Sequence, residues 1–144
     1  MINVVNPNPK RFIYWKTSAA VNKGQLVVIS GGLALPAAEA VAGAYIVGVA
    51  AEDAASGATC TIIPVLGEEL EFDIYQGGAT DTFATAGIGT LYDIYVDGAA
   101  GDLSAEGEMY LDPNDTDGAF VYLMRFDNTA RKAWGRVALA STLL

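Results

Sequence analysis

The sequence contains no histidine and a single cysteine among its 144 residues. Without histidine, the chain lacks the side chain that most often serves as a general base or as a ligand of transition metals. The one cysteine, Cys60, lies in an apolar stretch with no histidine to activate it, which predicts a small buried residue rather than a nucleophile. We therefore expect no enzyme activity, no cofactor and no disulfide.

Long hydrophobic runs are also missing from the chain. No apolar stretch approaches the roughly 18 residues that a membrane-spanning helix needs. The N-terminus carries its basic residues after its apolar ones and contains two prolines, which is not the pattern of a signal peptide. We expect no membrane partner.

Positive charge is absent from the middle of the chain. No lysine or arginine occurs between Gly24 and Met124, whereas sixteen of the seventeen acidic residues do. The segments before, within and after this stretch carry charges of +4, −16 and +3, for a net charge of −9. Such a middle repels nucleic acid and anionic lipid, so we expect no nucleic-acid partner. The basic ends either pair with the acidic body within one fold or reach an acidic neighbour, and the sequence leaves both open.

What the chain does contain is a series of short apolar runs that are rich in valine and isoleucine and bounded by turn residues. The clearest lie between Lys23 and Ile74 and read LVVIS, YIVGVA, TCTIIPVL and LEFDI. Long helical periodicity is missing, and the apolar fraction of 52% is enough to build one core. We predict an all-β fold, a small β-barrel or sandwich of short antiparallel strands. Residues 23–144 would form a single β-barrel-like domain and residues 1–22 an extended N-terminal arm.

Glycine and proline positions predict local features of these strands. Gly31-Gly32 suits a tight hairpin turn after LVVIS. Gly48 indicates a bulge or a close approach of another backbone, and Pro64 indicates an edge strand or a bulged strand.

Two runs alternate between apolar and polar residues. In Glu69–Ile74 the acidic residues share one face and the apolar residues share the other. The carboxylates therefore lie side by side on a solvated face, whereas a glycoside hydrolase needs two that face each other across a bond. In the run 91–96, the same alternation points Asp93 outward.

The loop Asp112–Gly118 has the composition of a calcium-binding loop. Its spacing departs from the D-x-[DN]-x-[DN]-G pattern, because Thr116 and Asp117 occupy the fifth and sixth places. Plain turns have the same composition, and a bound cation is left open. The tyrosines of the apolar runs indicate core or cross-strand packing rather than a platform for sugars.

The first 22 residues differ in character from the rest. The stretch Asn6-Pro7-Asn8-Pro9 cannot continue a helix or a central strand, and aromatic residues interleaved with basic ones follow it. This aromatic surface is buried either in the protein's own core or against a neighbour, since Tyr, Trp and Arg are the residues that anchor interfaces. The candidate contact residues are Pro7, Pro9, Lys10, Arg11, Phe12, Tyr14, Trp15 and Lys16.

The segment from Gly24 to Ile74, 51 of the 144 residues, resembles the decoration (cement) proteins of tailed-bacteriophage capsids. The resemblance rests on the spacing of glycine and apolar residues. It is carried by Lys23-Gly24-Gln-Leu-Val-Val, by AGAYIVGVA at 42–50, by Ala55-Ser-Gly57-Ala and by IIPVLG at 62–67. The stretch from Gly89 to Gly98 is similar in style.

This resemblance implies a β-barrel-like subunit that forms a homotrimer on the exterior of the virion capsid, after synthesis in the host cytoplasm. The subunit would bind the major capsid protein at junctions between its copies, with the terminal arm helping to hold them. An alternative, favoured by the tyrosines and the Asp-rich loops, is a carbohydrate-binding or adhesive β-module displayed on a virion or a cell surface.

Overall fold

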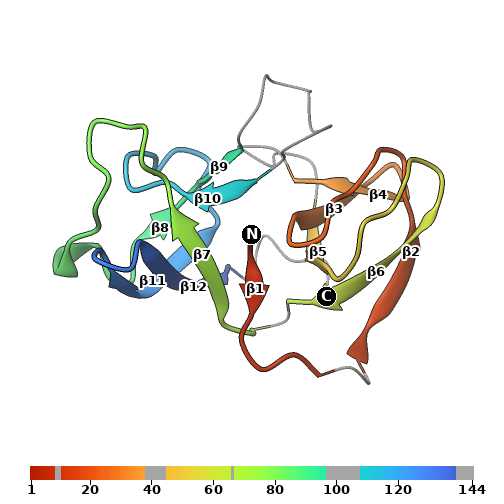
Figure 1. Ribbon diagram of the computed structural model, residues 1–144, viewed down its shortest axis with the longest axis horizontal. Coiled ribbons are helices and arrows are strands. Elements are labelled where there is room, and N and C mark those ends of the chain that lie inside the picture. Colours follow the sequence, from red (N-terminus) through yellow and green to blue (C-terminus); the bar gives the residue numbers. More distant parts are fainter. Residues whose placement is uncertain (9–10, 38–44, 66, 97–107, 139–144) are drawn as a thin grey trace.

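The structure, a computed structural model, describes residues 1–8, 11–37, 45–65, 67–96 and 108–138. These residues form twelve β-strands and a 3₁₀ helix, η2 (Thr85–Gly87), and they contain no α-helix (Figure 1). The predicted all-β fold is confirmed. Within the described part of the chain, no helix has the length and apolarity of a membrane-crossing segment.

Five strands from the first half of the chain form one sheet, in the order β2-β6-β5-β3-β4, and every pair in it is antiparallel. The strands are β2 (Ile13–Lys16), β3 (Leu26–Ser30), β4 (Leu33–Pro36), β5 (Tyr45–Ala50) and β6 (Thr59–Pro64). The two outer strands approach each other, because Thr17, directly after β2, bridges to Ala34 of β4. The backbone N–H of Ser18 also donates to the Ala34 carbonyl at 2.8 Å. The sheet therefore curls into a small barrel, which occupies the right of Figure 1.

The remaining seven strands form a second sheet, in the order β8-β11-β12-β7-β10-β9, with β1 also paired to β7. They are β1 (Asn3–Val4), β7 (Leu70–Ile74), β8 (Leu91–Tyr92), β9 (Ile94–Val96), β10 (Met109–Leu111), β11 (Val121–Asp127) and β12 (Lys132–Val137). One side of β7 is shared, because β1 lies beside Leu70 and Glu71 while β10 lies beside Asp73 and Ile74. The β7–β10 pair is parallel, which departs from the expected purely antiparallel arrangement.

Asp93 joins the two edges of the seven-stranded sheet. It separates β8, which pairs with β11, from β9, which pairs with β10. The prediction that Asp93 points outward is wrong, since it is only 1% exposed. Its Oδ1 accepts the N–H of Ile94 at 2.8 Å, and its backbone N–H donates to the Asp115 carbonyl at 2.9 Å. The alternation of apolar and polar residues gives the wrong orientation here because the chain changes its partner strand at this residue. Asp93 therefore does not lie on a sheet face, and it is buried with hydrogen-bond partners.

Two hydrophobic clusters fill the fold. The smaller lies inside the five-stranded barrel and includes Val27, Val47, Cys60 and Ile62. The larger spans both sheets, and consecutive residues of one strand serve both clusters: Val28 of β3 packs in the larger and Val27 in the smaller. The barrel wall is therefore apolar on both faces, which is why LVVIS reads as a continuous hydrophobic run.

The predicted roles of the glycines are confirmed. Gly31 and Gly32 both have positive φ in the β3–β4 turn, the geometry of a two-residue hairpin. The register of β3 on β5 shifts beside Gly48, and a Cβ there would collide with the carbonyl of Ile63. Gly48 thus meets both expectations, a bulge and a close backbone approach.

The prediction for Pro64 is wrong in one respect. The strand β6 is internal, with β2 on one side and β5 on the other. Pro64 is tolerated because it is the last residue of β6, and β2 reaches only as far as Ile62. At Pro64 the missing backbone N–H therefore costs no hydrogen bond to β2.

Candidate functional site

The N-terminal 22 residues contact both sheets. The strand β1 pairs with β7 of the seven-stranded sheet, and β2 pairs with β6 of the barrel. Between Met1 and Asn3 the side chain of Ile2 is buried, and its N–H donates to the Gly24 carbonyl at 2.9 Å. The predicted contact residues thus belong to a segment that is anchored at both ends.

The strand β2 presents two different faces. Ile13 and Trp15 pack against the core of the barrel, and the indole N–H of Trp15 donates to the Gly32 carbonyl at 3.0 Å. The alternate residues, Tyr14 and Lys16, are exposed, and Tyr14 is 68% exposed. The aromatic cluster is therefore split: Trp15 is used inside the protein and Tyr14 faces outward.

A groove lies next to this strand. Its volume is about 330 Å³, and its lining includes Pro7 and Phe12 from the N-terminal segment, Ile63 of β6, and Lys23. Phe12 is half-buried and Pro7 is exposed. The groove brings predicted residues together beside a basic residue that the sequence reasoning did not select.

The other predicted contact residues differ in whether the structure describes them and in whether they form ion pairs. Pro9 and Lys10 lie outside the described residues. The guanidinium of Arg11 lies 3.7 Å from a carboxylate oxygen of Glu68, whereas Lys16 forms no ion pair with any described residue. The basic N-terminal end was expected either to pair with the acidic body or to reach an acidic neighbour. Arg11 pairs with the body, whereas Lys16 is available for contact with a neighbour.

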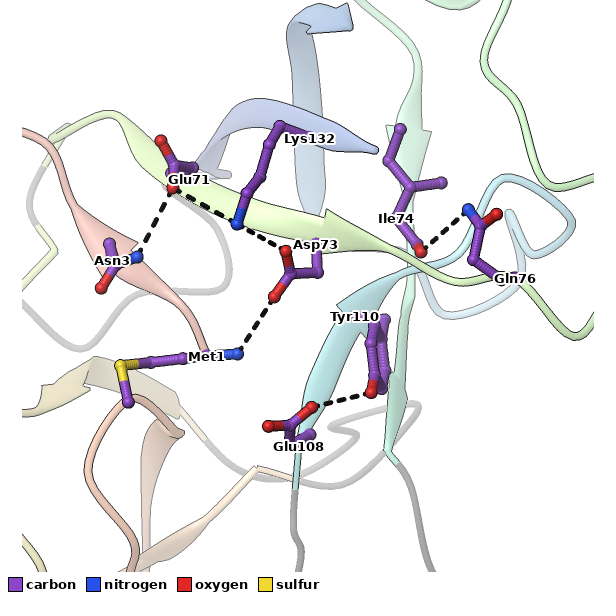
Figure 2. Close-up of polar contacts among 9 residues, drawn as sticks. All are labelled: Met1, Asn3, Glu71, Asp73, Ile74, Gln76, Glu108, Tyr110 and Lys132. Carbon is purple, nitrogen blue, oxygen red and sulfur yellow. Dashed lines mark hydrogen bonds and ion pairs between the residues drawn. The ribbon is translucent and has the colours of Figure 1, made fainter. Parts of the chain in front are cut away.

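The acidic face of β7 pairs with the basic C-terminal strands. Arg125 of β11 contacts Glu69 at 2.6 Å and also lies over the ring of Trp134, 4.1 Å from its centroid. Lys132 of β12 lies 2.5 Å from Asp73 and 3.7 Å from Glu71 (Figure 2). The carboxylates are therefore half-buried and compensated within the fold rather than simply solvated.

The pair of Asp73 and Lys132 titrates abnormally. Burial alone would raise the pKa of Asp73, but the hydrogen bond and charge of Lys132, together with the N-terminal ammonium group, hold that pKa below its ordinary value. The hydrogen bond from Lys132 to Asp73 raises the pKa of Lys132 against an opposing effect of burial, with the charge of Glu71 adding to the rise. Both groups are thus held in their charged forms.

A cleft lined by tyrosines opens beside this ion-pair network. Tyr75, Tyr95 and Tyr110 line it, together with the polar side chains of Gln76, Glu108 and Arg131. Tyr95 and Tyr110 are opposite residues of β9 and β10, and both rings contact that of Tyr75, so these three tyrosines pack across strands as expected. The sequence reasoning missed the cleft, because the contribution of Tyr75 depends on the parallel pairing of β7 with β10.

Two other candidate sites, the thiol of Cys60 and the loop Asp112–Gly118, have structural roles. Cys60 is buried, and burial, with the charge of Glu52 as a smaller effect, raises the pKa of its thiol. In the loop Asp112–Gly118, Oδ1 of Asp112 accepts the backbone and side-chain N–H groups of Asn114, each at 2.8 Å. Within the part of the chain that the structure describes, no group of three or more acidic or cysteine residues is placed to hold a metal ion.

Comparisons of this chain with protein-family models, with curated proteins and with solved structures find no match. Its function is therefore inferred from its own residues.

Proposed function

We propose that the protein is a capsid decoration (cement) protein of a tailed bacteriophage. It binds the outer surface of the assembled head and stabilises contacts between subunits of the major capsid protein. It acts as a homotrimer and carries out no chemical reaction.

The observation that carries the proposal is the outward face of β2. Pairing with β6, the Thr17–Ala34 bridge and the hydrogen bond from Trp15 to Gly32 fix this strand. A large aromatic residue, Tyr14, is then displayed on a rigid backbone, so binding through it costs little conformational entropy. Exposed tyrosine beside basic residues is the composition of interface anchors.

Charge supports the same face. Lys16 and Lys23 make no ion pair with any described residue, although the chain as a whole carries −9. Lys16 lies on β2 with Tyr14, and Lys23 lines the adjoining groove with Phe12. A partner surface with exposed carboxylates would complement this face and would be repelled by the acidic remainder of the molecule.

The segment that resembles the decoration proteins builds the support for this face. Residues 24–74 contribute β3 to β6 of the barrel and continue into β7. The barrel thus serves as the scaffold and β2 as the contact strand. Binding of the assembled lattice, and not of its separated subunits, stabilises the lattice by mass action, and a trimer adds avidity.

Co-sedimentation with heads tests the proposal. Heads assembled from the major capsid protein of the same phage are incubated with the wild-type chain and with the double variant Tyr14→Ala, Lys16→Glu. Both side chains are exposed, so the variant is expected to keep the wild-type melting temperature. We expect binding to weaken by at least about tenfold, equivalent to about 1.4 kcal/mol.

Tyr122→Ala is the matched control, because Tyr122 is 41% exposed on β11 of the other sheet. It is expected to bind as wild type does. Wild-type binding by the double variant, or an equal loss in the control, would overturn the assignment of this face. Sedimentation velocity tests the trimer separately: a mass of one 15.0 kDa chain at every concentration would contradict it.

A further inference from the structure

The cleft between β7, β9 and β10 has the size of a ligand site. Its volume is about 540 Å³, within the range of about 300–1,000 Å³ that is typical of small-molecule pockets. Its lining combines three aromatic rings with a few polar side chains, which is the usual composition of such pockets. Neither the capsid proposal nor the packing of the core requires an open cavity here.

The three rings are held in place. Tyr75 and Tyr95 stack with centroids 3.8 Å apart and planes 18° apart, and Tyr110 is tilted by 55° to Tyr75 at 6.2 Å. A Cβ at Gly77 would collide with the hydroxyl of Tyr75, so glycine allows that ring to lie against the backbone. Tyr75 and Tyr95 cover each other's inner faces, so a sugar can pack only on the outer side of this stack. There the C–H face of a sugar ring can pack on an aromatic face, since the ring face is negative and the C–H groups are weakly positive.

The polar side chains of the cleft are oriented and retain hydrogen-bonding capacity. Glu108 accepts the hydroxyl of Tyr110 on Oε2 at 2.8 Å, and no described residue donates to its Oε1, which can serve as an acceptor (Figure 2). Gln76 donates its amide N–H groups to the carbonyls of Ile74 and Asp81, both at 3.2 Å, and its Oε1 accepts from no residue in the described part of the chain. The guanidinium of Arg131 forms no ion pair with a described residue and supplies donors.

The charges around the cleft favour a neutral ligand over a charged one. Asp73, at the edge of the cleft, is compensated by Lys132 and by the N-terminal ammonium group. Among the described residues that line the cleft, the remaining charges are one carboxylate, on Glu108, and one guanidinium, on Arg131. A cation or a phosphate would gain one partner and meet one like charge, whereas a neutral molecule with many hydroxyl groups can bond to both.

From this geometry we infer that the tyrosine cleft is a binding site for a neutral carbohydrate, one or two pyranose units of a larger glycan. One face of the sugar packs on the outer side of the tyrosine stack, and its hydroxyl groups donate to Glu108 and Gln76 and accept from Arg131. The inference does not rest on the capsid proposal. It gives a location to the carbohydrate-binding function that the sequence left as an alternative.

Saturation-transfer NMR on the full chain tests the inference. The probes are glucose, galactose, mannose, N-acetylglucosamine and the disaccharides cellobiose, lactose and chitobiose, with choline as a cationic competitor. We expect at least one sugar to receive saturation and choline to receive none. Tyr95→Ala is expected to weaken the affinity for that sugar at least about tenfold, because it removes one of the two stacked rings.

Two further variants keep the result interpretable if Tyr95→Ala loses stability. Glu108→Gln changes an exposed side chain, and Arg131→Gly suits the positive φ of 57° at that position, so both are expected to fold normally. Each should weaken binding of the same sugar several-fold, whereas Tyr45→Ala, at a position 52% exposed on β5 of the other sheet, should not. Silence from every sugar, binding of choline alone, or sugar binding unchanged in all three cleft variants would overturn the inference.

Discussion

The indole N–H of Trp15 donates a hydrogen bond to the carbonyl oxygen of Gly32 at 3.0 Å, and so ties β2 to the turn between β3 and β4. The strands β2 and β4 stand at opposite ends of the sheet order, so this bond helps to close the barrel. Because neighbouring residues of a strand point to opposite faces, fixing Trp15 inward also fixes Tyr14 outward.

Replacing Trp15 by phenylalanine removes this hydrogen bond and keeps an aromatic ring. We expect the free energy of unfolding to fall by about 1 kcal/mol, the usual contribution of one hydrogen bond with some loss of packing. Urea denaturation measures the change. Tyr14→Phe, which removes a hydroxyl from an exposed ring, is the control and should match wild type. Equal stability of Trp15→Phe and wild type would show that the bond does not contribute to closure.

Gly48→Ala tests the close approach of β5 and β6. The added methyl group would collide with the backbone carbonyl of Ile63, which cannot move without disturbing the strand pair. We expect a loss of about 1–3 kcal/mol or more, as for overpacked cores. Gly57→Ala, where the Cβ meets open space but φ is +82°, should cost only about 1 kcal/mol. A smaller loss at Gly48 than at Gly57 would contradict the collision, and thermal melts of both variants decide between them.

The ion pair between Lys132 and Asp73 predicts a pH dependence of stability. The pKa of Asp73 lies below its ordinary value of 3.8 in the folded state, so its contribution is present above about pH 4 and is lost as the pH falls further. The pKa of Lys132 lies above its ordinary value of 10.5, so its contribution is present below that pH and is lost as the pH rises through the folded value.

Urea denaturation of Lys132→Met at pH 3, 7 and 10 measures this contribution. The variant should be less stable than wild type at pH 7, by less than about 1 kcal/mol because the pair is partly exposed, and the gap should close toward pH 3. Lys16→Met, which removes a lysine without an ion pair to a described residue, should follow the wild-type curve at all three values. A gap of the same size at pH 3 and pH 7 would rule out Asp73 as the partner.

Asn128 pairs with the backbone of Phe83 in both directions. Its Oδ1 accepts the Phe83 N–H at 3.0 Å, and its Nδ2 donates to the Phe83 carbonyl at 2.9 Å. Asn128→Ala leaves both partly buried backbone groups without this partner, and we expect a loss of about 1–3 kcal/mol. Asn128→Asp keeps only the acceptor, and its stability should lie between those of wild type and Asn128→Ala. Amide hydrogen exchange at Phe83 should accelerate in the alanine variant and stay unchanged in the exposed neighbour Thr129→Ala; protection that persists without Asn128 would contradict the pairing.

The sequence was sufficient to predict strands where local chemistry decides the conformation. Val and Ile runs, the Gly31-Gly32 turn and the alternation of Glu69–Ile74 all depend on neighbours in the chain. The bulge at Gly48 could also be predicted, because a glycine inside a strand often marks a bulge or a site where another backbone approaches closely.

Features that depend on distant pairing could not be predicted. The burial of Asp93 follows from a change of partner strand, from β11 to β10, that no local pattern encodes. The same holds for the tyrosine cleft, since Tyr75 meets Tyr95 only after β10 has been placed between β7 and β9. Within the candidate contact strand, alternation alone places Tyr14 and Trp15 on opposite faces. It does not show which of the two faces outward.

Thermal disassembly of heads tests most directly whether the protein stabilises an assembled head by binding it. Heads that lack the protein are titrated with it, and the disassembly temperature is followed by light scattering. We expect this temperature to rise and to saturate with protein concentration, as linkage requires for a ligand of the assembled state alone. The double variant Tyr14→Ala, Lys16→Glu should need at least about tenfold more protein to give the same rise. A disassembly temperature that is the same at every concentration of the wild-type protein would contradict stabilisation of the head by this protein.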